Sequence, residues 1–463
     1  MSFLSLKTMK NFTCQCCGQC CKWEGFVKAT EAEMDAAAKL LGIPLDEFIQ
    51  KYTKLSQDRQ SLVFTDRADG ACVFLDDHNR CKIYTARPWQ CRTFPHEWDV
   101  PPELQKLCPG HRLAERADAS QADALPLIHV LGHPALPVDI ENAPGDAQVL
   151  NCHNFCLMLS QLGIPYIYYG CAGSKLPPGG MLVDCGKPTG KWSYRNKWHQ
   201  IYNKRLTNHL KKHVRLDGKP EIITSIYGAA QSDIETFGLP VVEPMVGYDH
   251  CWAPYRVFPS YAHQHTIYAQ QADFTATNRF FDTVIPHFLD DTKYWPSNNL
   301  QNYLLFIGRD APGKGLPIAQ QAAEKAGLEL KVVHNGCFGT EKTELLANAR
   351  AVLMPTLYVE PFGYVAIEAQ MCGTPIITTD WGAFAETVLH GLTGFRCRTQ
   401  AEFVAAIGKA SRLDRNFIRD YALNHFSIKK IAPKYKAYFD FVWNVHKNGG
   451  YYADAAFRDE TFL

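Results

Sequence analysis

Short, continuous apolar runs alternate with Ala-rich segments of helical periodicity between residues 302 and 391. The runs are NYLLFIGR, LELKVVHNG, RAVLMPT and TPIITTD, and the segments between them are IAQQAAEKAG, KTELLANA and VAIEAQMCG. Apolar runs of strand length that are separated by helices are typical of a parallel sheet covered on both faces. The pattern therefore predicts a Rossmann-like domain of the α/β class.

A similar series precedes it between residues 125 and 248. LPLIHVLGHP, IPYIYYG, EIITSIYG and LPVVEPMVGY are expected to be strands, and GDAQVLNCHNFCLMLSQLG is expected to be a helix between the first two. A strand, a helix and a strand with short connections form the βαβ unit of a parallel sheet. We therefore expect two Rossmann-like domains with a cleft between them and an active site at the carboxyl ends of their strands.

Charge and hydropathy limit the function classes. The chain has 48 Lys and Arg against 47 Asp and Glu, which argues against a generally basic protein that coats nucleic acid but allows a local basic patch. The apolar runs are all shorter than a membrane span, and the first residues, MSFLSLKTMKNFTC, lack the apolar core of a signal peptide. The expected compartment is the cytoplasm.

Cysteines concentrate in the first quarter of the chain. Nine of the 17 lie within residues 1–108, and five fall in the segment TCQCCGQCC. An odd number cannot pair completely as intramolecular disulfides, and a chain without an export signal favours metal ligation. The C-x-x-C spacing of Cys17 and Cys20 lets two thiolates turn back onto one ion. We expect a soft-metal site here rather than a set of buried structural thiols.

This segment resembles the YkgJ-type cysteine-cluster family, whose members are described as zinc- or iron-chelating proteins. The matching positions are Cys14, Cys17, Cys20, Cys21, Cys72, Phe74, Leu75, Cys81, Ile83, Tyr84, Arg87, Pro88, Cys91, Arg92, Phe94 and Pro95. The resemblance implies metal ligation by Cys14, Cys17, Cys20, Cys21, Cys72, Cys81, Cys91 and Cys108. Zinc is the first expectation because a closed thiolate site suits it, and iron or an iron–sulfur cluster is the alternative.

Residues 300–400 resemble the retaining GT-B glycosyltransferases of the large family that contains sucrose synthase. The matching segments are LLFIGRDAPGKG and PTLYVEPFGYVAIEAQMCGTPIITTDWGAFAETVLHGLTGF, and the second holds the E-x7-E spacing of Glu360 and Glu368. The resemblance extends more weakly over residues 125–300. It implies a GT-B architecture of two Rossmann-like domains, here preceded by a small cysteine-rich metal-binding module.

The donor implied by this resemblance is a nucleotide sugar, whose diphosphate becomes the leaving group. Fixed cations or helix N-termini must stabilise the charge that develops on it. Arg309 and Lys314 follow an apolar strand, flanking a Gly/Pro loop, where they could reach a diphosphate. By resemblance, Glu360 contacts the reacting end of the donor sugar, and Glu368 binds the ribose hydroxyls.

The predicted donor site therefore joins two loops and one helix. Glu360, Arg309 and Lys314 are the expected catalytic residues, and the expected donor-binding residues are Arg309, Lys314, Glu360, Pro361, Phe362, Gly363 and Glu368. Backbone N–H groups of the turn that starts the helix can meet sugar hydroxyls or phosphate oxygens. The resemblance implies no protein nucleophile, because the leaving phosphate can deprotonate the acceptor hydroxyl, and no metal ion at the transferase site.

The resemblance also divides the chain into four parts. These are a cysteine-cluster domain at 1–118, an acceptor domain at 119–288, a donor domain at 289–425, and a C-terminal helix at 426–463 that crosses back to the acceptor domain. The polar, Ala-rich segment LAERADASQADAL at 113–125 is the expected linker.

The acceptor side is predicted mainly from composition. Residues 191–219 carry nine Lys or Arg against one acid, and Lys197, Lys204 and Lys211 recur every seven residues as one helical stripe. Such a stripe is usually a solvated helix face; the alternative is a surface for a polyanionic acceptor such as DNA, RNA, or a phosphorylated lipid or glycan. Gly145, which offers close approach to a phosphate, and His250, in a histidine-rich segment, complete the acceptor-side prediction.

A function of another class is compatible with the same motifs. In that alternative the chain is a metal-binding or redox protein, and the GT-B body is a non-catalytic binding scaffold. The complete set of Arg309, Lys314, Glu360 and Glu368 argues against an inactive body. Binding of nucleotide sugars would distinguish the two alternatives.

Overall fold

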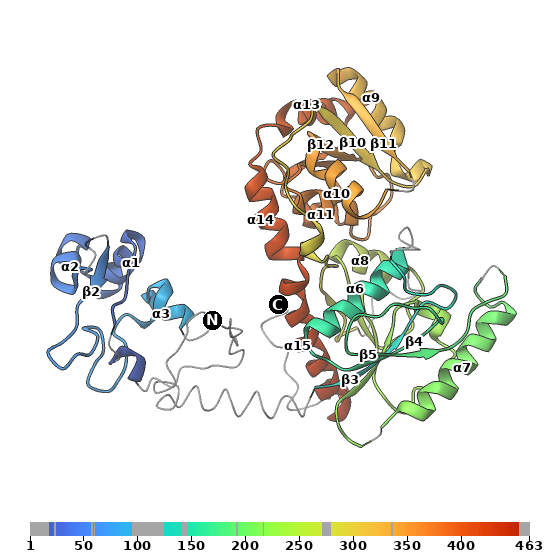
Figure 1. Ribbon diagram of the computed structural model, residues 1–463, viewed down its shortest axis with the longest axis horizontal. Coiled ribbons are helices and arrows are strands. Elements are labelled where there is room, and N and C mark those ends of the chain that lie inside the picture. The colour runs from blue at the N-terminus through green and yellow to red at the C-terminus, as the bar shows by residue number, and fades with distance from the viewer. Residues whose placement is uncertain are drawn as a thin grey trace, which may run out of the picture. The chain divides into compact units, whose positions relative to one another are not determined.

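The computed structural model describes residues 18–22, 25–56, 59, 61–94, 125–140, 147–190, 193–215, 217–270, 279–334 and 337–452. The chain divides into two compact units, Met1–Leu125 and Pro126–Leu463 (Figure 1). Within the described ranges, no helix combines the length and the apolar character that a bilayer crossing needs. The finer boundaries expected within the second unit stay predictions.

The first unit packs short helices on a two-stranded antiparallel sheet. Its elements are η1 (Gln19–Cys21), α1 (Glu31–Leu41), α2 (Leu45–Tyr52), β1 (Thr53–Leu55), β2 (Leu62–Phe64), η2 (Tyr84–Ala86) and α3 (Trp89–Thr93). A capping box of Thr30 and Glu33 starts α1, and Gly42, with a φ of 71°, ends it. Its core joins Met34 and Phe48 to Phe64 and Phe74.

A seven-stranded, wholly parallel sheet opens the second unit, with the order β5-β4-β3-β6-β7-β8-β9. The strands are β3 (Leu127–Leu131), β4 (Tyr166–Gly170), β5 (Gly180–Asp184), β6 (Glu221–Ser225), β7 (Val241–Glu243), β8 (Tyr255–Phe258) and β9 (Thr283–Val284). The helices beside them are α6 (Ala147–Gln161), α7 (Lys197–His213) and α8 (Tyr261–Ala269), with the short turn η3 (Gly228–Gln231). The sheet contains every strand predicted in this region and adds three that were not predicted: β5, a partly exposed edge strand, and the short strands β8 and β9.

A five-stranded parallel sheet follows, with the order β11-β10-β12-β13-β14. Its elements are β10 (Tyr303–Ile307), α9 (Leu316–Ala326), β11 (Glu329–Val333), α10 (Gly339–Asn348), β12 (Ala351–Met354), α11 (Tyr364–Met371), β13 (Ile376–Thr379), α12 (Phe384–Thr387), β14 (Gly394–Cys397) and α13 (Gln400–Ala410). The 3-10 turn η4 (Asp291–Lys293) lies before β10, and the turn η5 (Pro312–Lys314) connects β10 to α9. The strands and helices predicted from the apolar runs are all present, which confirms the α/β class.

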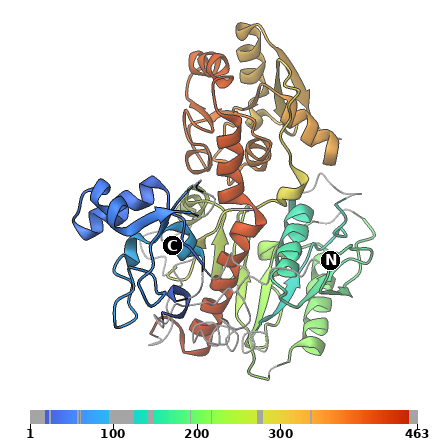
Figure 2. The ribbon, with the colours of Figure 1, turned by 60° about the vertical axis from the view of Figure 1, so that its left-hand side comes forward.

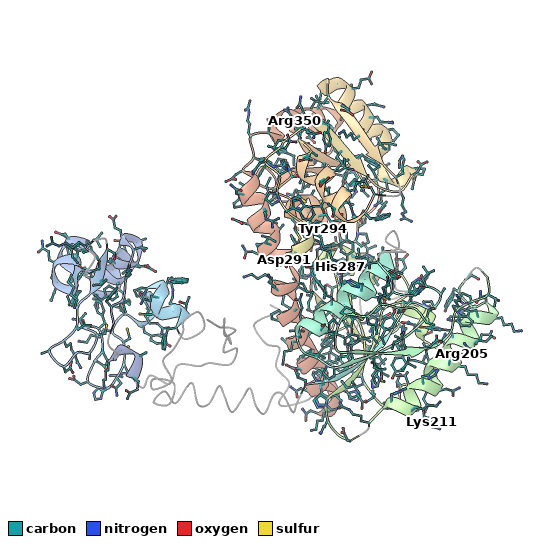
Figure 3. All side chains as sticks on the ribbon, viewed as in Figure 1. Arg205, Lys211, His287, Asp291, Tyr294 and Arg350 are labelled. Carbon is teal, nitrogen blue, oxygen red and sulfur yellow. The ribbon has the colours of Figure 1, made fainter. Side chains whose placement is uncertain are left out.

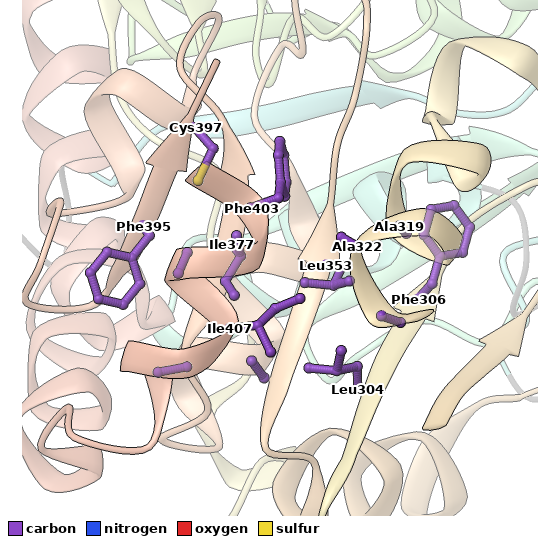
Figure 4. Packing of buried hydrophobic residues seen from close by; sticks show 14 residues of the cluster. Leu304, Phe306, Ala319, Ala322, Leu353, Ile377, Phe395, Cys397, Phe403 and Ile407 are labelled. Atoms are coloured by element: carbon purple, nitrogen blue, oxygen red, sulfur yellow. The ribbon is translucent and has the colours of Figure 1, made fainter. Parts of the chain in front are cut away.

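Apolar side chains cover both faces of this second sheet. On one face, Ala319 and Ala322 of α9 and Phe403 and Ile407 of α13 pack against Leu353 of the sheet (Figure 4). On the other, α10 and α11 contribute a separate buried cluster. These layers leave the loops at the carboxyl ends of the strands as the part of the sheet that is free to bind a ligand.

The chain ends in two helices that return to the first sheet. These are α14 (Arg415–Phe426) and α15 (Ile428–Lys447), followed by η6 (Gly450–Tyr452). The rings of Tyr435 and Phe439 on α15 contact Phe155 of α6, and the Tyr438 hydroxyl donates to the Phe281 carbonyl at 2.9 Å. Both views show α15, in red, running alongside the seven-stranded sheet (Figures 1 and 2). The last helix therefore packs on the part of the unit that contains the seven-stranded sheet.

Candidate active site

The loop after β10 places one predicted cation beside the carboxylate predicted for the donor sugar. Lys314 ends the turn η5, and its Nζ lies 3.0 Å from Glu360 Oε2. The next residue, Gly315, has a φ of 73°, and a Cβ there would lie 2.0 Å from the Pro355 carbonyl oxygen. Only glycine allows this loop to pack against the end of β12, which is what brings the lysine to the glutamate.

A tyrosine completes this contact. The Tyr358 hydroxyl donates to Glu360 Oε2 at 2.9 Å, and Lys314 Nζ lies 4.9 Å from the centre of the Tyr358 ring. Burial lowers the pKa of Lys314, but the Glu360 carboxylate and the Tyr358 hydroxyl outweigh burial and raise it overall. The lysine is therefore a permanent cation at neutral pH, in position to face a diphosphate.

Arg309 lies at the same edge of the sheet, two residues after β10. Its side chain is exposed, and no carboxylate of the described residues forms an ion pair with it. An exposed guanidinium without an acidic partner is available to an anionic ligand at little desolvation cost. The structure thus brings Lys314 and Glu360 together and leaves Arg309 separate from them.

The turn that carries Glu360 leads directly into α11. Gly363 is the N-cap residue of that helix with a φ of 86°, and a Cβ on it would meet the Phe384 ring at 2.7 Å. Phe362 is buried, with its ring 5.0 Å from the His287 ring and 5.9 Å from the Phe426 ring. Phe362 can therefore offer a donor only its backbone, while its side chain fixes the turn to the core.

Glu368, the second glutamate of the motif, is 3% exposed and engaged by protein partners. The Tyr294 hydroxyl donates to its Oε1 at 3.0 Å, and Lys342 Nζ of α10 lies 2.5 Å from its Oε2 (Figure 3 labels Tyr294). A ribose would have to share this carboxylate with the lysine. The ribose-binding role of Glu368 stays a prediction, and Lys342 joins the residues that surround it.

The carboxyl ends of the two sheets meet at the N-terminus of α8. The Ser260 hydroxyl donates to the Pro361 carbonyl at 2.7 Å, and the backbone N–H groups of Tyr261 and Ala262 donate to the Glu386 carboxylate at 2.9 and 2.8 Å. Pro361 and Glu386 belong to the half of the unit that carries the five-stranded sheet, the predicted donor half, and the α8 residues belong to the half that carries the seven-stranded sheet. One hydrogen bond therefore attaches the Glu360 turn itself to α8, and two attach Glu386 to it.

His263 lies in the first turn of α8, where its N–H donates to the Ser260 hydroxyl at 3.1 Å. It is 4% exposed, and its Nε2 has no hydrogen-bond partner among the described residues. Burial lowers its pKa, while a hydrogen bond to the Tyr248 backbone and the charges of Asp249 and Glu360 oppose that shift. A buried neutral imidazole with a vacant nitrogen near Glu360 can exchange a hydrogen bond with a ligand hydroxyl.

The acceptor residues predicted from the sequence are dispersed. His250 is exposed, with a φ of 64°, and its carbonyl accepts the Ala229 N–H at 3.0 Å. Gly145 lies outside the described residues. Lys197, Lys204 and Lys211 are all exposed on α7, a helix without an acidic residue, and no carboxylate of the described residues pairs with them.

The lysine stripe runs away from the junction. Strand β5 ends at Asp184 at the carboxyl edge of the sheet, and β6 starts at Glu221 at the opposite edge, so α7 spans the sheet from one edge to the other. Lys211 lies at the end of α7 that is far from the second sheet (Figure 3). Of the three lysines, Lys197 on the first turn is therefore nearest the junction.

Five of the eight predicted metal ligands are described in the first unit: Cys20, Cys21, Cys72, Cys81 and Cys91. Cys20 Sγ lies 3.9 Å from Cys21 Sγ, and the Cys72 N–H donates to the Cys21 carbonyl at 2.7 Å. Burial, reinforced by the charges of Cys72, Cys20 and Cys81, raises the pKa of Cys91 to about 12.

The charges of these thiols raise one another's pKa, because they lie in the same part of the first unit. The described residues alone do not group three or more ligands around a common point. Cys14, Cys17 and Cys108 lie outside them. A set of thiols fits zinc or iron by its chemistry, and it is the donor type that both metals share.

Sequence reasoning missed three residues around the donor motif: Tyr358, Lys342 and Tyr294. Tyr358 carried a local signal, because it stands two residues before Glu360, whereas Tyr294 and Lys342 are brought to the motif only by the fold. The sequence did point to Glu386, as a further glutamate in the segment that resembles the donor signature, and to His263, as one of a cluster of histidines with His250 and His265, but it assigned neither a definite role.

Two segments of the chain match known protein families, and several known proteins are similar to it in sequence. Residues 285–412 match "Glycosyl transferases group 1", and residues 13–112 match "Putative zinc- or iron-chelating domain". Glycogen synthase of Mycobacterium tuberculosis is 44% identical over 70 residues, which are 15% of this chain and 17% of that protein. Sucrose synthase of Solanum tuberosum is 25% identical over 150 residues, 28% of this chain and 18% of that protein. The chain thus spans less than a fifth of the length of these two relatives.

Solved structures share the fold of the second unit. AviGT4, a glycosyltransferase involved in avilamycin A biosynthesis, superimposes with a TM-score of 0.50 at 18% identity, covering 68% of this chain and 98% of that one. Sucrose-phosphate synthase from Thermosynechococcus elongatus gives a TM-score of 0.52 at 16% identity, covering 67% of this chain and 97% of that one. The chain therefore combines a group 1 glycosyltransferase domain in a GT-B fold with an N-terminal CxxCxxCC domain.

Proposed function

We propose that this protein transfers a sugar from a nucleotide-sugar donor to an acceptor hydroxyl with retention of configuration. The observation that carries the proposal is the Lys314–Glu360 contact of 3.0 Å at the carboxyl edge of the second sheet. It lies within the residues that match the group 1 glycosyltransferases. A cation for the diphosphate and a carboxylate for the sugar thus occupy one site, as the two ends of such a donor require.

The proposed reaction breaks the bond between the anomeric carbon and the diphosphate oxygen. The acceptor oxygen forms its new bond to that carbon on the same face, and the acceptor proton passes to the leaving phosphate. Lys314, with Arg309 from the same edge, stabilises the negative charge that accumulates on the diphosphate. Glu360 contacts the sugar at its reacting end, and the turn from Pro361 to Gly363 orients it through backbone groups.

We further propose that the acceptor is polyanionic. The support is the exposed face of α7, where Lys197, Lys204 and Lys211 have no acidic partner among the described residues. The segment 191–219 carries a net charge of +8 in a chain whose net charge is +1. Such a concentration of charge attracts phosphates of DNA or of a phosphorylated glycan or lipid. Lys197 would lie closest to the reacting unit and Lys211 farthest from it.

The first unit is proposed to hold zinc, with iron as the alternative, through Cys20, Cys21, Cys72, Cys81 and Cys91 together with the cysteines outside the described residues. Bound metal would cross-link loops of a unit whose apolar core is small. The thiol set supports a structural site, because four thiolates complete the coordination of zinc and leave no position for a substrate.

A donor-hydrolysis screen tests the transferase proposal. The full chain would be incubated with UDP-, GDP- and ADP-sugars, and release of the nucleoside diphosphate would be measured. We expect turnover of at least one donor, lost in Lys314→Ala. A chain that neither hydrolyses nor binds any of these donors in calorimetry would instead support the non-catalytic scaffold.

A further inference from the structure

We propose that Glu386 is a positioning residue for transfer: it docks the N-terminus of α8 onto the donor half and so holds the Glu360 turn in its working arrangement. The inference rests on the proposed function. Glu386 itself does not have to touch the substrate, because its carboxylate is occupied by Tyr261 and Ala262.

The contact joins a carboxylate to a helix N-terminus from the other half of the unit. Each Glu386 oxygen accepts one backbone N–H, from Tyr261 at 2.9 Å and from Ala262 at 2.8 Å. These N–H groups lie in the first turn of α8 and have no partner within the helix. A carboxylate at this position is favoured both by the two hydrogen bonds and by the helix dipole.

Glu386 is tied to the Glu360 turn on its own side of the junction. The Ala383 N–H donates to the Glu360 carbonyl at 2.9 Å, and a Cβ on Gly382 would lie 2.7 Å from the Glu360 nitrogen. The short helix that bears Glu386 and the turn that bears Glu360 are therefore in direct backbone contact. If α8 separates from Glu386, we therefore expect the position of the Glu360 turn to change.

Ser260 forms the second attachment. Its hydroxyl donates to the Pro361 carbonyl at 2.7 Å and accepts the His263 N–H at 3.1 Å. Ser260 therefore both caps α8 and binds the Glu360 turn. His263 follows on the same turn of the helix, with its vacant Nε2 buried near Glu360. The Glu386 contact thus also sets how far His263 stands from the reacting end of a donor sugar.

The strength of the Glu386 contact with α8 is compatible with two halves that close for transfer and open again for product release. The Glu386 side chain is exposed, and exposed charge-assisted contacts are weak enough to break on the timescale of turnover. Product release requires the two halves to separate, whereas transfer requires them to be together. Glu386 would bias this equilibrium toward the closed arrangement without making opening slow.

The test uses Glu386→Gln in the full chain, with Glu402→Gln as the matched control. Glu402 also accepts two backbone N–H groups at a helix start, from Arg398 at 2.6 Å and Thr399 at 3.2 Å, but within the donor half alone. With the nucleotide sugar that the wild type hydrolyses, we expect kcat of Glu386→Gln to fall about tenfold or more, because geometry at the reacting centre is lost. Affinity for the free nucleoside diphosphate should be unchanged, and Glu402→Gln should keep its kcat.

A second measurement does not depend on activity. Hydrogen exchange of the peptide that contains Tyr261 and Ala262 should be faster in Glu386→Gln than in wild type, and unchanged in Glu402→Gln. Normal kcat and normal exchange in folded Glu386→Gln would overturn the inference while leaving the proposed function intact. Equal losses of kcat in both variants would also overturn it, because the effect would then be one of stability. A wild type that turns over no donor would overturn the proposed function itself, and the inference with it.

Discussion

Lys314 Nζ lies 3.0 Å from Glu360 Oε2, so the cation predicted for the diphosphate and the carboxylate predicted for the sugar form one ion pair. Both side chains are largely buried, at 18% and 12% exposure. A donor that enters the site must exchange this pair for contacts of its own. The pair keeps both charges compensated until then, since an uncompensated charge at this depth is costly.

The first prediction concerns this pair. Lys314→Ala and Glu360→Ala should each lower kcat/KM for donor hydrolysis by about 100- to 1,000-fold, since one fixed charge at the reaction centre contributes on the order of 2–4 kcal/mol. Initial-rate kinetics with the nucleotide sugar found by screening would measure the effect. Lys325→Ala, an exposed lysine of α9 in the same domain, is the matched control and should be normal. Normal turnover in both site variants would refute the site.

The second prediction concerns metal. Protein purified anaerobically should contain stoichiometric zinc or iron, and Cys72→Ser should contain less of it than wild type, because a closed zinc site needs all four of its thiolates. Cys251→Ser, a half-buried cysteine of the second unit, is the control and should retain the metal. Elemental analysis measures both. Metal-free wild-type protein with free thiols and undiminished thermal stability would contradict the metal site.

The third prediction concerns the acceptor. Replacing Lys197, Lys204 and Lys211 by Gln should weaken binding of a polyanionic acceptor and lower the slope of log K against log salt by about 2 to 3, as expected when three phosphate contacts are lost. Donor hydrolysis should be unaffected. The matched control changes the same net charge elsewhere: Lys325, Lys409 and Lys430, exposed lysines of the second unit, are replaced by Gln. Should both triple variants bind and transfer alike at every salt concentration, the α7 face is only solvated.

The fourth prediction concerns pH and stability. Burial lowers the pKa of His287 to about 3, and burial together with the charge of Lys293 lowers the pKa of His153 to about 4. An unfolded chain protonates histidine near pH 6.5. Between about pH 6 and pH 4 the unfolded state therefore takes up protons that the folded state does not. The unfolding free energy should fall on acidification by about 1.4 kcal/mol per pH unit for each of these histidines.

His287→Phe isolates one of these contributions. The His287 ring stacks on Tyr364 with centroids 5.2 Å apart, so a phenyl ring is a close substitute in shape. Urea unfolding at pH 4, 5 and 6 should show a pH dependence that is shallower in the variant by about 1.4 kcal/mol per unit. Identical slopes for wild type and variant would show that His287 does not remain neutral in the folded protein.

Local patterns were sufficient for most of the fold. Continuous apolar runs such as those of β10, β12 and β13 occur where a strand is buried on both faces. Such strands can be recognised in the sequence without knowledge of their tertiary contacts. The edge strand β5 was not predicted: its apolar run of Met181, Leu182 and Val183 is short, and these side chains are only partly buried. The strands that the pattern missed are the edge strands β5, β9 and β14 and the short inner strand β8, whereas the edge strand β11 was predicted.

The donor motif could also be predicted from the sequence, because its residues are close together in the chain. Glu360, Gly363 and Glu368 occupy one turn and one helix, where spacing alone determines which side chains share a region. Lys314 could be predicted as a cation near a strand end. Its 3.0 Å contact with Glu360 could not, because that distance depends on Gly315 packing against Pro355.

Only the tertiary structure decided which residues of the first sheet reach the donor motif. The sequence pointed to His250, yet His250 is exposed, whereas His263 is buried in the first turn of α8, next to the Ser260 that binds the Pro361 carbonyl. Composition and spacing describe each histidine alike, whereas the direction of α8 and its attachment to Glu386 select one of them. A single chain segment encodes its own periodicity and turns; contacts between segments more than a hundred residues apart arise only when two folded sheets pack together.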